Sequence, residues 1–209
     1  MRLGIVTLVL TALMLVAGCG NPATNKSQAV TSEATQAPSG QPAAAQQYAI
    51  TPENSKIEFV GSKVTGSHNG SFQNFSGEID YTGDVTTSRV NITMETDSLT
   101  TDTPDLTKHL KTADFFDVPK YPQATFTSTA IKPGGDNGAS HTVTGNLNLH
   151  GVNKSVTFPA TIAAAPDAIT VDSSFAINRK DFGINYAGAA DNLIRDDVVL
   201  TLKIKATKR

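Results

Sequence analysis

The sequence contains no tryptophan and a single cysteine, Cys19. A lone thiol cannot close an intrachain disulfide, so the fold is not stabilised by covalent cross-links. It also leaves no cysteine set for a structural zinc site, and no pair among the four histidines has zinc-ligand spacing. We therefore expect no metal site and no cofactor.

The motifs of the large enzyme classes are also missing. The chain has no Gly-x-Ser-x-Gly nucleophile motif, no Walker-type phosphate loop and no dinucleotide-binding glycine fingerprint. Acidic residues are present, but nothing in the pattern places two carboxyl groups in opposed environments, which acid–base catalysis requires. We therefore predict that the protein is not an enzyme.

The charge balance argues against a nucleic-acid partner. Lysine and arginine number 17 against 19 aspartates and glutamates, a formal net charge of −2, and the two signs are interspersed. Nucleic-acid-binding domains carry a basic patch or stripe, and this sequence has none. We expect no nucleic-acid partner.

The first residues have the composition of an export signal. Arg2 provides a positive charge, and residues 3–16 are apolar apart from one glycine and two threonines. This stretch is shorter than the run of about 20 apolar residues that a membrane-spanning helix needs. We expect residues 1–18 to be a cleaved signal peptide.

The next motif, Val16-Ala17-Gly18-Cys19, resembles the lipobox of bacterial lipoproteins, in which small residues precede a cysteine that becomes acylated. The alternative is an ordinary signal peptide with an incidental cysteine. The resemblance implies a diacylglycerol thioether on Cys19 with palmitate-type chains. Each buried methylene contributes about 0.8 kcal/mol, so two or more chains give stable anchoring to the membrane. Because Gly20 follows instead of Asp, we expect the outer membrane of a two-membrane envelope, with the domain facing the periplasm.

A polar segment separates this motif from the rest of the chain. Residues 20–47 are rich in Ala, Gln, Ser, Thr, Pro and Gly and contain no Phe or Leu. Such a composition cannot bury enough apolar surface to offset the entropy of ordering the chain. We therefore expect residues 19–47 to be an acylated cysteine with a disordered linker, typically about 30 Å from end to end. Residues 48–209 have a suitable length for one domain.

The dominant pattern of this domain is an alternation of apolar and polar residues with a period of two. Clusters of Gly, Asn, Asp and Pro separate the alternating segments. The pattern predicts an all-β fold of seven or eight antiparallel strands, each with one buried face. Periodicity alone leaves a sandwich and a closed barrel as alternatives. The apolar faces are Ile57 and Phe59; Val90, Ile92 and Met94; Val143, Gly145, Leu147 and Leu149; Val156, Phe158, Ala160 and Ile162; Ile169, Val171, Ser173, Phe175 and Ile177; and Val198, Leu200, Leu202 and Ile204.

One segment has helical spacing instead. Thr103 is a suitable N-cap, and Pro104 suits the first helical position. Leu106, Leu110 and Ala113 then recur on one helical face. We predict a short helix that covers an open end or edge of the sheet.

Several short segments, none of them specific alone, occur in a characteristic order through residues 48–209. Together they resemble the YceI-like, polyisoprenoid-binding family of bacterial envelope proteins. The resemblance implies an extended, lipocalin-like, eight-stranded antiparallel β-barrel with one short capping helix, whose long cavity holds an isoprenoid chain. It implies binding and not catalysis. The segments are residues 55–59 (SKIEF), 70–77 (GSFQNFSG), 97–101 (DSLTT), 109–117 (HLKTADFFD), 121–122 (YP), 126–128 (FTS), 143–147 (VTGNL), 150–154 (HGVNK) and 178–183 (NRKDFG).

Phenylalanine dominates the aromatic residues, with nine Phe and four Tyr. Phe offers a large apolar area without a polar group that needs a partner, which suits a hydrocarbon chain. An eight-stranded barrel can either be filled by its own side chains or hold one slender ligand. An ordinary filled core is therefore the alternative, and the resemblance favours the cavity. The predicted cavity-lining residues are Phe59, Phe72, Phe75, Phe126, Phe158 and Phe175.

Four polar residues in the family-like segments are candidates for head-group contacts or for loop anchors: His109, His150, Arg179 and Asp181. For the two histidines, hydrogen bonds to backbone carbonyls are favoured over contacts with a ligand. Arg179 and Asp181 are expected to form an ion pair that holds their loop.

These patterns predict a membrane-anchored periplasmic carrier that holds a long apolar lipid, isoprenoid or quinone-like, inside the barrel. The first alternative is a structural or protein-interaction module of the cell envelope with a filled barrel and no ligand. The second is a lipid-modifying enzyme, which requires His109 or His150 to point inward beside a carboxylate. The sequence leaves open which lipid is bound and whether the domain is a monomer or a homodimer.

Overall fold

The computed structural model describes residues 20–37 and 45–209. The predicted signal peptide and the predicted acylation site, Cys19, lie outside the described residues. Within the described ranges, no helix is both long enough and apolar enough to cross a membrane.

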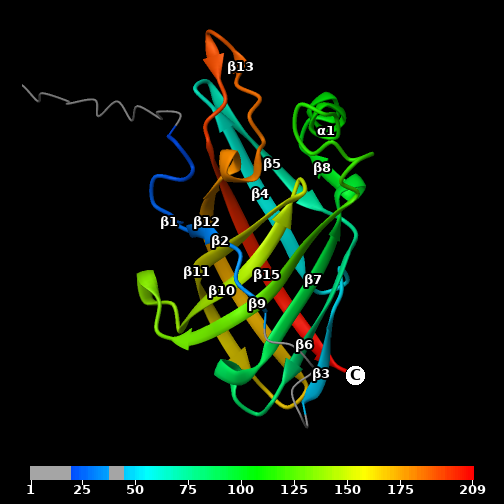
Figure 1. The fold of residues 1–209 in the computed structure, drawn as a ribbon, viewed down its shortest axis with the longest axis vertical. Coiled ribbons are helices and arrows are strands. Elements are labelled where there is room, and N and C mark those ends of the chain that lie inside the picture. Colours follow the sequence, from blue (N-terminus) through cyan, green and yellow to red (C-terminus); the bar gives the residue numbers. More distant parts are fainter. Residues whose placement is uncertain (1–19, 38–44) are drawn as a thin grey trace, which may run out of the picture.

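Within the described residues, eight antiparallel strands form a closed barrel (Figure 1). Neighbouring strands pair in the order β12, β11, β10, β9, β7, β6, β3. The ring closes because β15 pairs with both ends of this row, with β12 along the whole length of β12 and with β3. This confirms the barrel over the sandwich that periodicity left open. The strands of the ring are β3 (Gln46–Ile50), β6 (Phe75–Tyr81), β7 (Arg89–Glu95), β9 (Gln123–Pro133), β10 (His141–Leu149), β11 (Val152–Ala164), β12 (Ala168–Asn178) and β15 (Asp197–Lys208).

Three further strands extend the sheet from β15 on one side of the barrel. β4 (Lys56–Lys63) pairs with β15 beyond β3, β5 (Gly66–Phe72) pairs with β4, and β8 (Leu99–Thr101) pairs with β5. The helix α1 (Pro104–Leu110) follows β8 in the chain. The Thr101 amide of β8 donates to the Thr107 hydroxyl of the helix at 2.8 Å. The helix therefore covers the end of the barrel at which β4 and β5 turn (Figure 1).

The short elements complete the connections between strands. The hairpin of β13 (Gly188–Ala189) and β14 (Asn192–Leu193) stands at the same end as α1 (Figure 1). We call this end, with α1 and the β4–β5 and β13–β14 hairpins, the mouth. The 3-10 helices are η1 (Val85–Thr87), η2 (Thr96–Ser98), η3 (Asp136–Gly138) and η4 (Arg179–Phe182).

The predicted helix is present but shorter than its spacing indicated. It begins at Pro104, with Thr103 as the N-cap, and ends at Leu110. Leu106 and Leu110 pack inward, whereas Ala113 lies beyond the helix and is exposed. The assignment of Ala113 to the helical face was wrong because the chain turns directly after Leu110, where the Phe116 amide bonds the Leu110 carbonyl at 3.0 Å.

Two tyrosines pack together at the end opposite the mouth. Tyr48, which is 1% exposed, donates its hydroxyl to the Pro166 carbonyl at 2.9 Å, in the turn between β11 and β12. Its ring meets the edge of Tyr81 on β6, with the ring centroids 6.0 Å apart. These contacts hold β3, β6 and the turn between β11 and β12 together at this end.

The N-terminal segment departs from the expected disorder. β1 (Ser27–Gln28) pairs with β12, and β2 (Val30–Glu33) pairs with β11. Among the described residues, the direct pairing of β11 with β12 covers Thr161 to Ala164 of β11, so the segment fills the space where these strands separate. Main-chain hydrogen bonds hold an added strand, and a polar composition provides them as well as an apolar one. The prediction of a disordered linker is therefore wrong for residues 20–37.

Candidate functional site

A cavity with a volume of about 430 Å³ runs inside the barrel. This volume lies within the range of about 300–1,000 Å³ that is usual for small-molecule sites. Its wall is made by the inward faces of the strands, and the predicted alternation places these side chains correctly: Val198, Leu200, Leu202 and Ile204 of β15 all line it. The structure is therefore hollow where a filled barrel would be packed.

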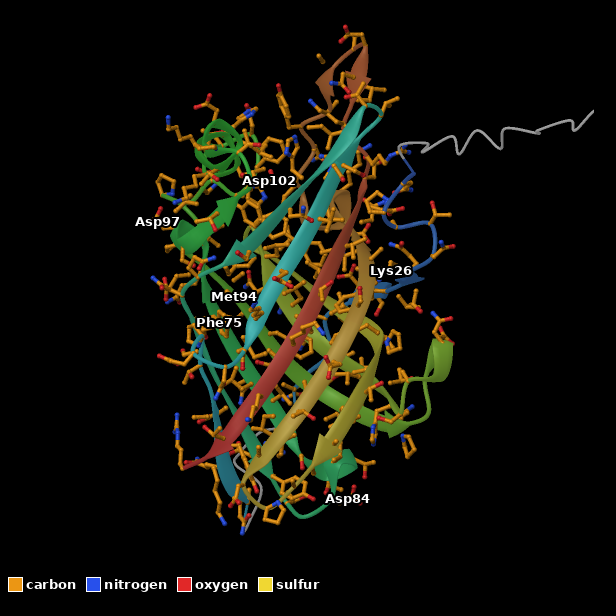
Figure 2. All side chains as sticks on the ribbon, turned by 180° about the vertical axis from the view of Figure 1, so that it is seen from behind. Lys26, Phe75, Asp84, Met94, Asp97 and Asp102 are labelled. Carbon is orange, nitrogen blue, oxygen red and sulfur yellow. The ribbon has the colours of Figure 1, made fainter. Side chains whose placement is uncertain are left out.

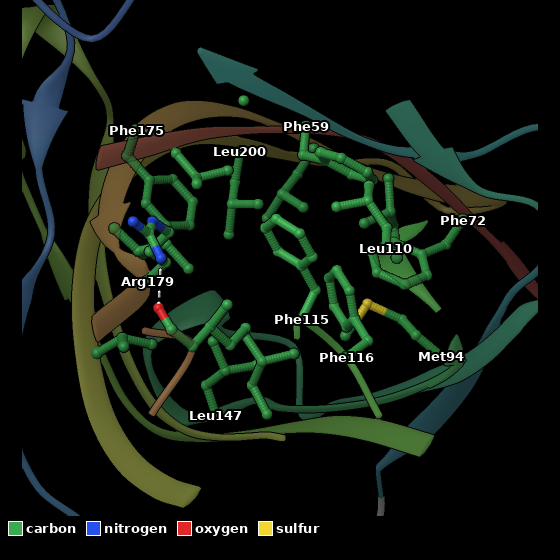
Figure 3. A pocket seen from close by; sticks show the side chains of 18 of the residues that line it. Phe59, Phe72, Met94, Leu110, Phe115, Phe116, Leu147, Phe175, Arg179 and Leu200 are labelled. Atoms are coloured by element: carbon green, nitrogen blue, oxygen red, sulfur yellow. Dashed lines mark hydrogen bonds between the residues drawn. The ribbon is translucent and has the colours of Figure 1, made fainter. Parts of the chain in front are cut away.

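Five of the six phenylalanines proposed from the sequence lie on this wall: Phe59, Phe72, Phe126, Phe158 and Phe175. Phe59, Phe72 and Phe175 are labelled in Figure 3. The Phe158 and Phe175 rings stack with centroids 4.2 Å apart and planes 9° apart. Phe126 meets Phe158 at 5.8 Å, and Phe59 meets Phe72 at 5.9 Å. The aromatic rings thus form two connected groups on the wall.

Two glycines explain how bulky rings leave the cavity open. Gly70 lies opposite Phe59, and a β-carbon at Gly70 would lie 2.2 Å from the Phe59 ring. At Gly145, a β-carbon would lie 2.3 Å from the Phe126 ring. Each ring therefore lies over the backbone of a neighbouring strand, in space that any other residue would fill. The missing side chains let the rings cover the wall without crossing the cavity.

The prediction does not hold for Phe75. This residue is 6% exposed and belongs to the core, but it is not among the residues that line the long cavity. Met94, its register partner on β7, does line the cavity, and the two residues are neighbours in Figure 2. An inward-facing Phe can pack between adjacent side chains without reaching the cavity, and period-two alternation does not distinguish these cases.

Two aromatic residues that follow α1 were not predicted to line the cavity. Phe115 and Phe116 line the cavity, and their rings project into it from the connecting loop (Figure 3). Phe116 meets Phe72 edge to face with a centroid distance of 6.0 Å. The adjacent Phe pair in a segment otherwise rich in charged residues was the available signal. It marks a loop that turns apolar side chains inward over the mouth.

Polar side chains line the cavity at the mouth. Lys63 and His68 come from the β4–β5 hairpin, His109 from α1, and Asn192 and Arg195 from the segment that follows β13. Tyr186, which also lines the cavity, is 38% exposed. The cavity therefore reaches the surface at this end, where its lining changes from apolar to polar.

Arg179 lines the cavity but is fully engaged in holding the mouth together. Its guanidinium donates to the carbonyl oxygens of Ile184 at 2.6 Å and Arg195 at 3.1 Å, and it contacts the Asp196 carboxylate at 3.4 Å. Burial lowers the pKa of Arg179, and the charge of Asp196 partly offsets this effect. Arginine stays protonated despite such a shift. We conclude that Arg179 fixes the loop between η4 and β15.

The expected Arg179–Asp181 ion pair is absent from the described residues. Asp181 is exposed, whereas Arg179 is buried and pairs with Asp196. Side chains two residues apart in a helical turn point in different directions, which explains the error. Asp181 is not part of the cavity lining.

The two histidines have different surroundings. His150 does not line the cavity, and its Nδ1 lies 3.2 Å from the Phe182 carbonyl, as a loop anchor would. His109 lines the cavity, lies 2.8 Å from the Asp114 carboxylate, and packs edge to face on Phe115 and Tyr186. This inward histidine beside a carboxylate is the arrangement that the enzyme alternative requires. Among the described residues, no cluster of three or more His, Cys, Asp or Glu could hold a metal ion.

Comparison of sequences places this architecture among known proteins. A model of the YceI-like domain matches residues 48–206. The chain is 35% identical over 136 residues to a UPF0312 protein of Pseudomonas putida (strain W619), covering 62% of this chain and 70% of that protein. It is 40% identical over 99 residues to Protein YceI of Salmonella arizonae, covering 47% and 50% of the two chains.

Solved structures share the fold. BcnA of Burkholderia cenocepacia superposes with a TM-score of 0.67 at 26% identity, covering 76% of this chain and 99% of BcnA. A polyisoprenoid binding domain from Saccharophagus degradans superposes with a TM-score of 0.62, covering 79% and 99% of the two chains. Its identity of 17% supports a common fold alone.

Proposed function

Because the chain belongs to the YceI-like family, we propose that it is a binding protein that holds a long apolar lipid, isoprenoid or quinone-like, inside its barrel. The observation that carries this proposal is the cavity of about 430 Å³, which is lined by Phe and aliphatic side chains. The Saccharophagus degradans neighbour, which is described as a polyisoprenoid binding domain, supports the isoprenoid class.

The lining supports a hydrocarbon chain as the ligand. Away from the mouth, the wall offers almost no hydrogen-bonding group, so a polar ligand would lose its bonds to water without replacement. Burial of an apolar chain contributes about 25 cal/mol per Å², less the freedom lost on binding. A filled barrel without a ligand does not agree with this cavity.

The proposal includes anchoring through Cys19 to the outer membrane, with the barrel in the periplasm. The lipobox-like residues before Cys19 support it. A Cys19→Ala variant is expected to be released into the soluble fraction, whereas the parent chain stays with the membrane. A parent chain that is equally soluble and carries no acyl mass would contradict the anchor but not the lipid cavity.

Mass spectrometry of extracts tests the cavity itself. Protein purified without harsh detergent is expected to carry a long-chain lipid at close to one molecule per chain. Leu200→Asp places a charge on the wall and is expected to abolish this lipid. Thr201→Asp is the matched control, because Leu200 lines the cavity and Thr201 does not. Lipid-free parent protein in repeated preparations, or equal loss in both variants, would contradict the proposal.

The His109–Asp114 pair supports a second candidate, a lipid-modifying activity at the mouth. A histidine beside a carboxylate at 2.8 Å can act as a general base. Turnover of a lipid ester that is lost in His109→Gln, with the bound lipid content unchanged, would favour this candidate. Equal turnover in the parent and the variant would eliminate it.

A further inference from the structure

We infer that the cavity has a second opening in the side of the barrel, between β11 and β12, and that residues 27–33 are a removable segment that closes it. This inference rests on the proposed lipid-binding function and adds a lateral route by which the lipid enters and leaves. Three observations carry it: a gap in the strand ladder, the cavity directly behind this gap, and the few contacts that hold residues 27–33 in place.

The gap between β11 and β12 has a cause in the sequence. Among the described residues, the direct pairing of these strands ends at the pair Thr161–Asp172. Shortly before Thr161 on β11 stands Pro159, whose carbonyl accepts from the Ser173 hydroxyl of β12 at 2.6 Å. In an antiparallel ladder the amide and the carbonyl of one residue point to the same neighbouring strand, and proline has no amide hydrogen. The main-chain ladder between the two strands therefore cannot continue through Pro159.

Residues 27–33 fill this gap as one extended segment. β1 pairs in parallel with β12, and β2 pairs antiparallel with β11. Between them, the Ala29 amide donates to the Ala176 carbonyl at 2.8 Å. Beyond the segment the two sides of the wall meet again, where His150 Nδ1 lies 3.2 Å from the Phe182 carbonyl. The gap is therefore bounded at both ends, and we call it the side window.

The long cavity lies directly behind the side window. On the β11 edge of the window Val156 and Phe158 line the cavity, and on the β12 edge Phe175 and Ile177 do so. The Phe158 and Phe175 rings stack with centroids 4.2 Å apart, so they join the two edges on the inner side where the strands diverge. Adjacent strands lie about 4.8 Å apart, so removal of the segment leaves a slot about 10 Å across between the two backbones. The freed space is that of one strand, which a hydrocarbon chain can occupy.

The segment is held mainly by main-chain hydrogen bonds. Its buried side chain, Ala29, is small, and its largest apolar side chain, Val30, is 66% exposed. Glu33 pairs with Lys154, but the Glu33 side chain is exposed, and ion pairs at the surface contribute little. Segments with few buried apolar contacts open locally at a lower free energy than core strands do. Residues 27–33 are therefore the part of the wall that can leave while the ring of strands stays paired.

The position of the segment in the chain brings the side window close to the membrane. Residues 27–33 lie outside residues 48–206, which the YceI-like domain model matches. The segment begins at Ser27, shortly after the proposed acylation site at Cys19. Between these two residues the chain spans at most about 29 Å. An anchored chain thus holds the side window near the bilayer from which a lipid would come.

A disulfide that locks the segment in place tests the inference. In the Cys19→Ala parent, which has no other cysteine, Val30→Cys and Thr157→Cys place two thiols on paired residues of β2 and β11. The α-carbons of paired residues in antiparallel strands are about 4.5–5.5 Å apart, which a disulfide can span. Ser174→Cys with Thr201→Cys is the matched control, because this pair joins β12 to β15 along a continuous ladder, with the two hydroxyls 3.2 Å apart.

The measured quantity is the rate of lipid release. Each delipidated chain is loaded with cis-parinaric acid, a slender polyene whose fluorescence rises in an apolar cavity, and is mixed with excess oleate. The locked Val30–Thr157 chain is expected to release the probe at least about tenfold more slowly than the parent, because the segment can no longer leave. Its equilibrium affinity is expected to stay unchanged, and reduction of the disulfide is expected to restore the parent rate. The oxidised control pair is expected to release the probe at the parent rate.

Ala29→Pro tests the opposite direction. It removes the amide that bonds the Ala176 carbonyl and changes no residue that lines the cavity. Release is expected to become about three- to tenfold faster, which is the effect of losing one main-chain hydrogen bond.

A parent rate in the locked chain would overturn the inference and leave lipid binding intact, because the lipid would then pass through the mouth alone. Equal slowing in the control pair would also overturn it, since that result shows a general stiffening of the barrel. An unchanged rate in Ala29→Pro would contradict it as well. If the delipidated parent takes up neither cis-parinaric acid nor geranylgeraniol, the proposed function fails and the inference fails with it.

Discussion

The wall and the mouth of the cavity are built by different means. The wall consists of inward side chains on strands whose backbones are paired along the barrel, and those side chains are apolar. The mouth consists of a helix, two hairpins and a loop, and several of its polar side chains, among them His68, His109 and Arg179, bond to backbone carbonyls or aspartates. The lining is therefore apolar along the paired strands, whereas its polar side chains lie at the mouth.

The largest effect on stability is expected at the mouth. Arg179→Met removes the side-chain donor to three carbonyls and leaves Asp196 with less compensation. We therefore expect a loss of about 3–5 kcal/mol in the free energy of unfolding. Chemical denaturation measures it. Lys180→Met is the control, since Lys180 also pairs with Asp196 but is 48% exposed, and it is expected to lose less than about 1 kcal/mol. Equal losses would show that burial of Arg179 is not what matters.

A smaller loss is expected on the wall. Phe158→Ala removes the ring that stacks on Phe175 and meets Phe126. Because one side of Phe158 faces the cavity, we expect about 2–3 kcal/mol, at or below the low end for a buried Phe. Thermal unfolding of lipid-free protein measures the loss. A loss as large as that of Arg179→Met would mean that the wall depends on Phe158 as a packed core does.

The glycine under Phe126 tests how the cavity stays open. Gly145→Ala is expected to cost about 1–3 kcal/mol, because its β-carbon overlaps the Phe126 ring. Gly61→Ala is the matched control: Gly61 also lines the cavity, but an added β-carbon there meets no atom within 4 Å. Phe126→Leu in the Gly145→Ala background is expected to restore part of the stability. Equal costs at the two glycines would refute this account of the wall.

The smallest effect is expected at the polar rim. The Asn69 amide and His68 bond Asp102 and hold its pKa below the usual range. A carboxyl group whose pKa is lower in the folded state than in the unfolded chain stabilises the fold at any pH above its unfolded pKa. This contribution is lost as the pH falls through the pKa of the folded state. Asp102→Asn is therefore expected to cost less than about 1 kcal/mol at neutral pH, and nothing in strong acid. Urea midpoints across this range measure it, and a difference that persists in acid would contradict the assignment.

The sequence predicted the wall better than the mouth for a physical reason. Alternation reports which strand residues are buried, so the faces of β12 and β15 could be read directly. Barrel closure could not be predicted from alternation, because it depends on pairings such as that of Ala49 with Thr207, which are far apart in sequence. The family resemblance supplied that step.

The mouth depends on loops, and loop partners follow from three-dimensional placement. Arg179 pairs with Asp196 and not with the nearer Asp181, and no spacing rule identifies that choice. The strands β1 and β2 were missed for a related reason, since their pairing uses main-chain groups that composition does not report.

The central claim is that a lipid chain occupies the hollow barrel, and the absence of native tryptophan allows a direct test. Phe158→Trp places a fluorophore on the cavity wall, and Phe75→Trp places one in the core beside Met94, outside the lining. A brominated long-chain lipid, which quenches tryptophan on close contact, is titrated into each delipidated variant. We predict saturable quenching near one equivalent in Phe158→Trp and little quenching in Phe75→Trp. Equal quenching in both variants, or none in either, would contradict the claim.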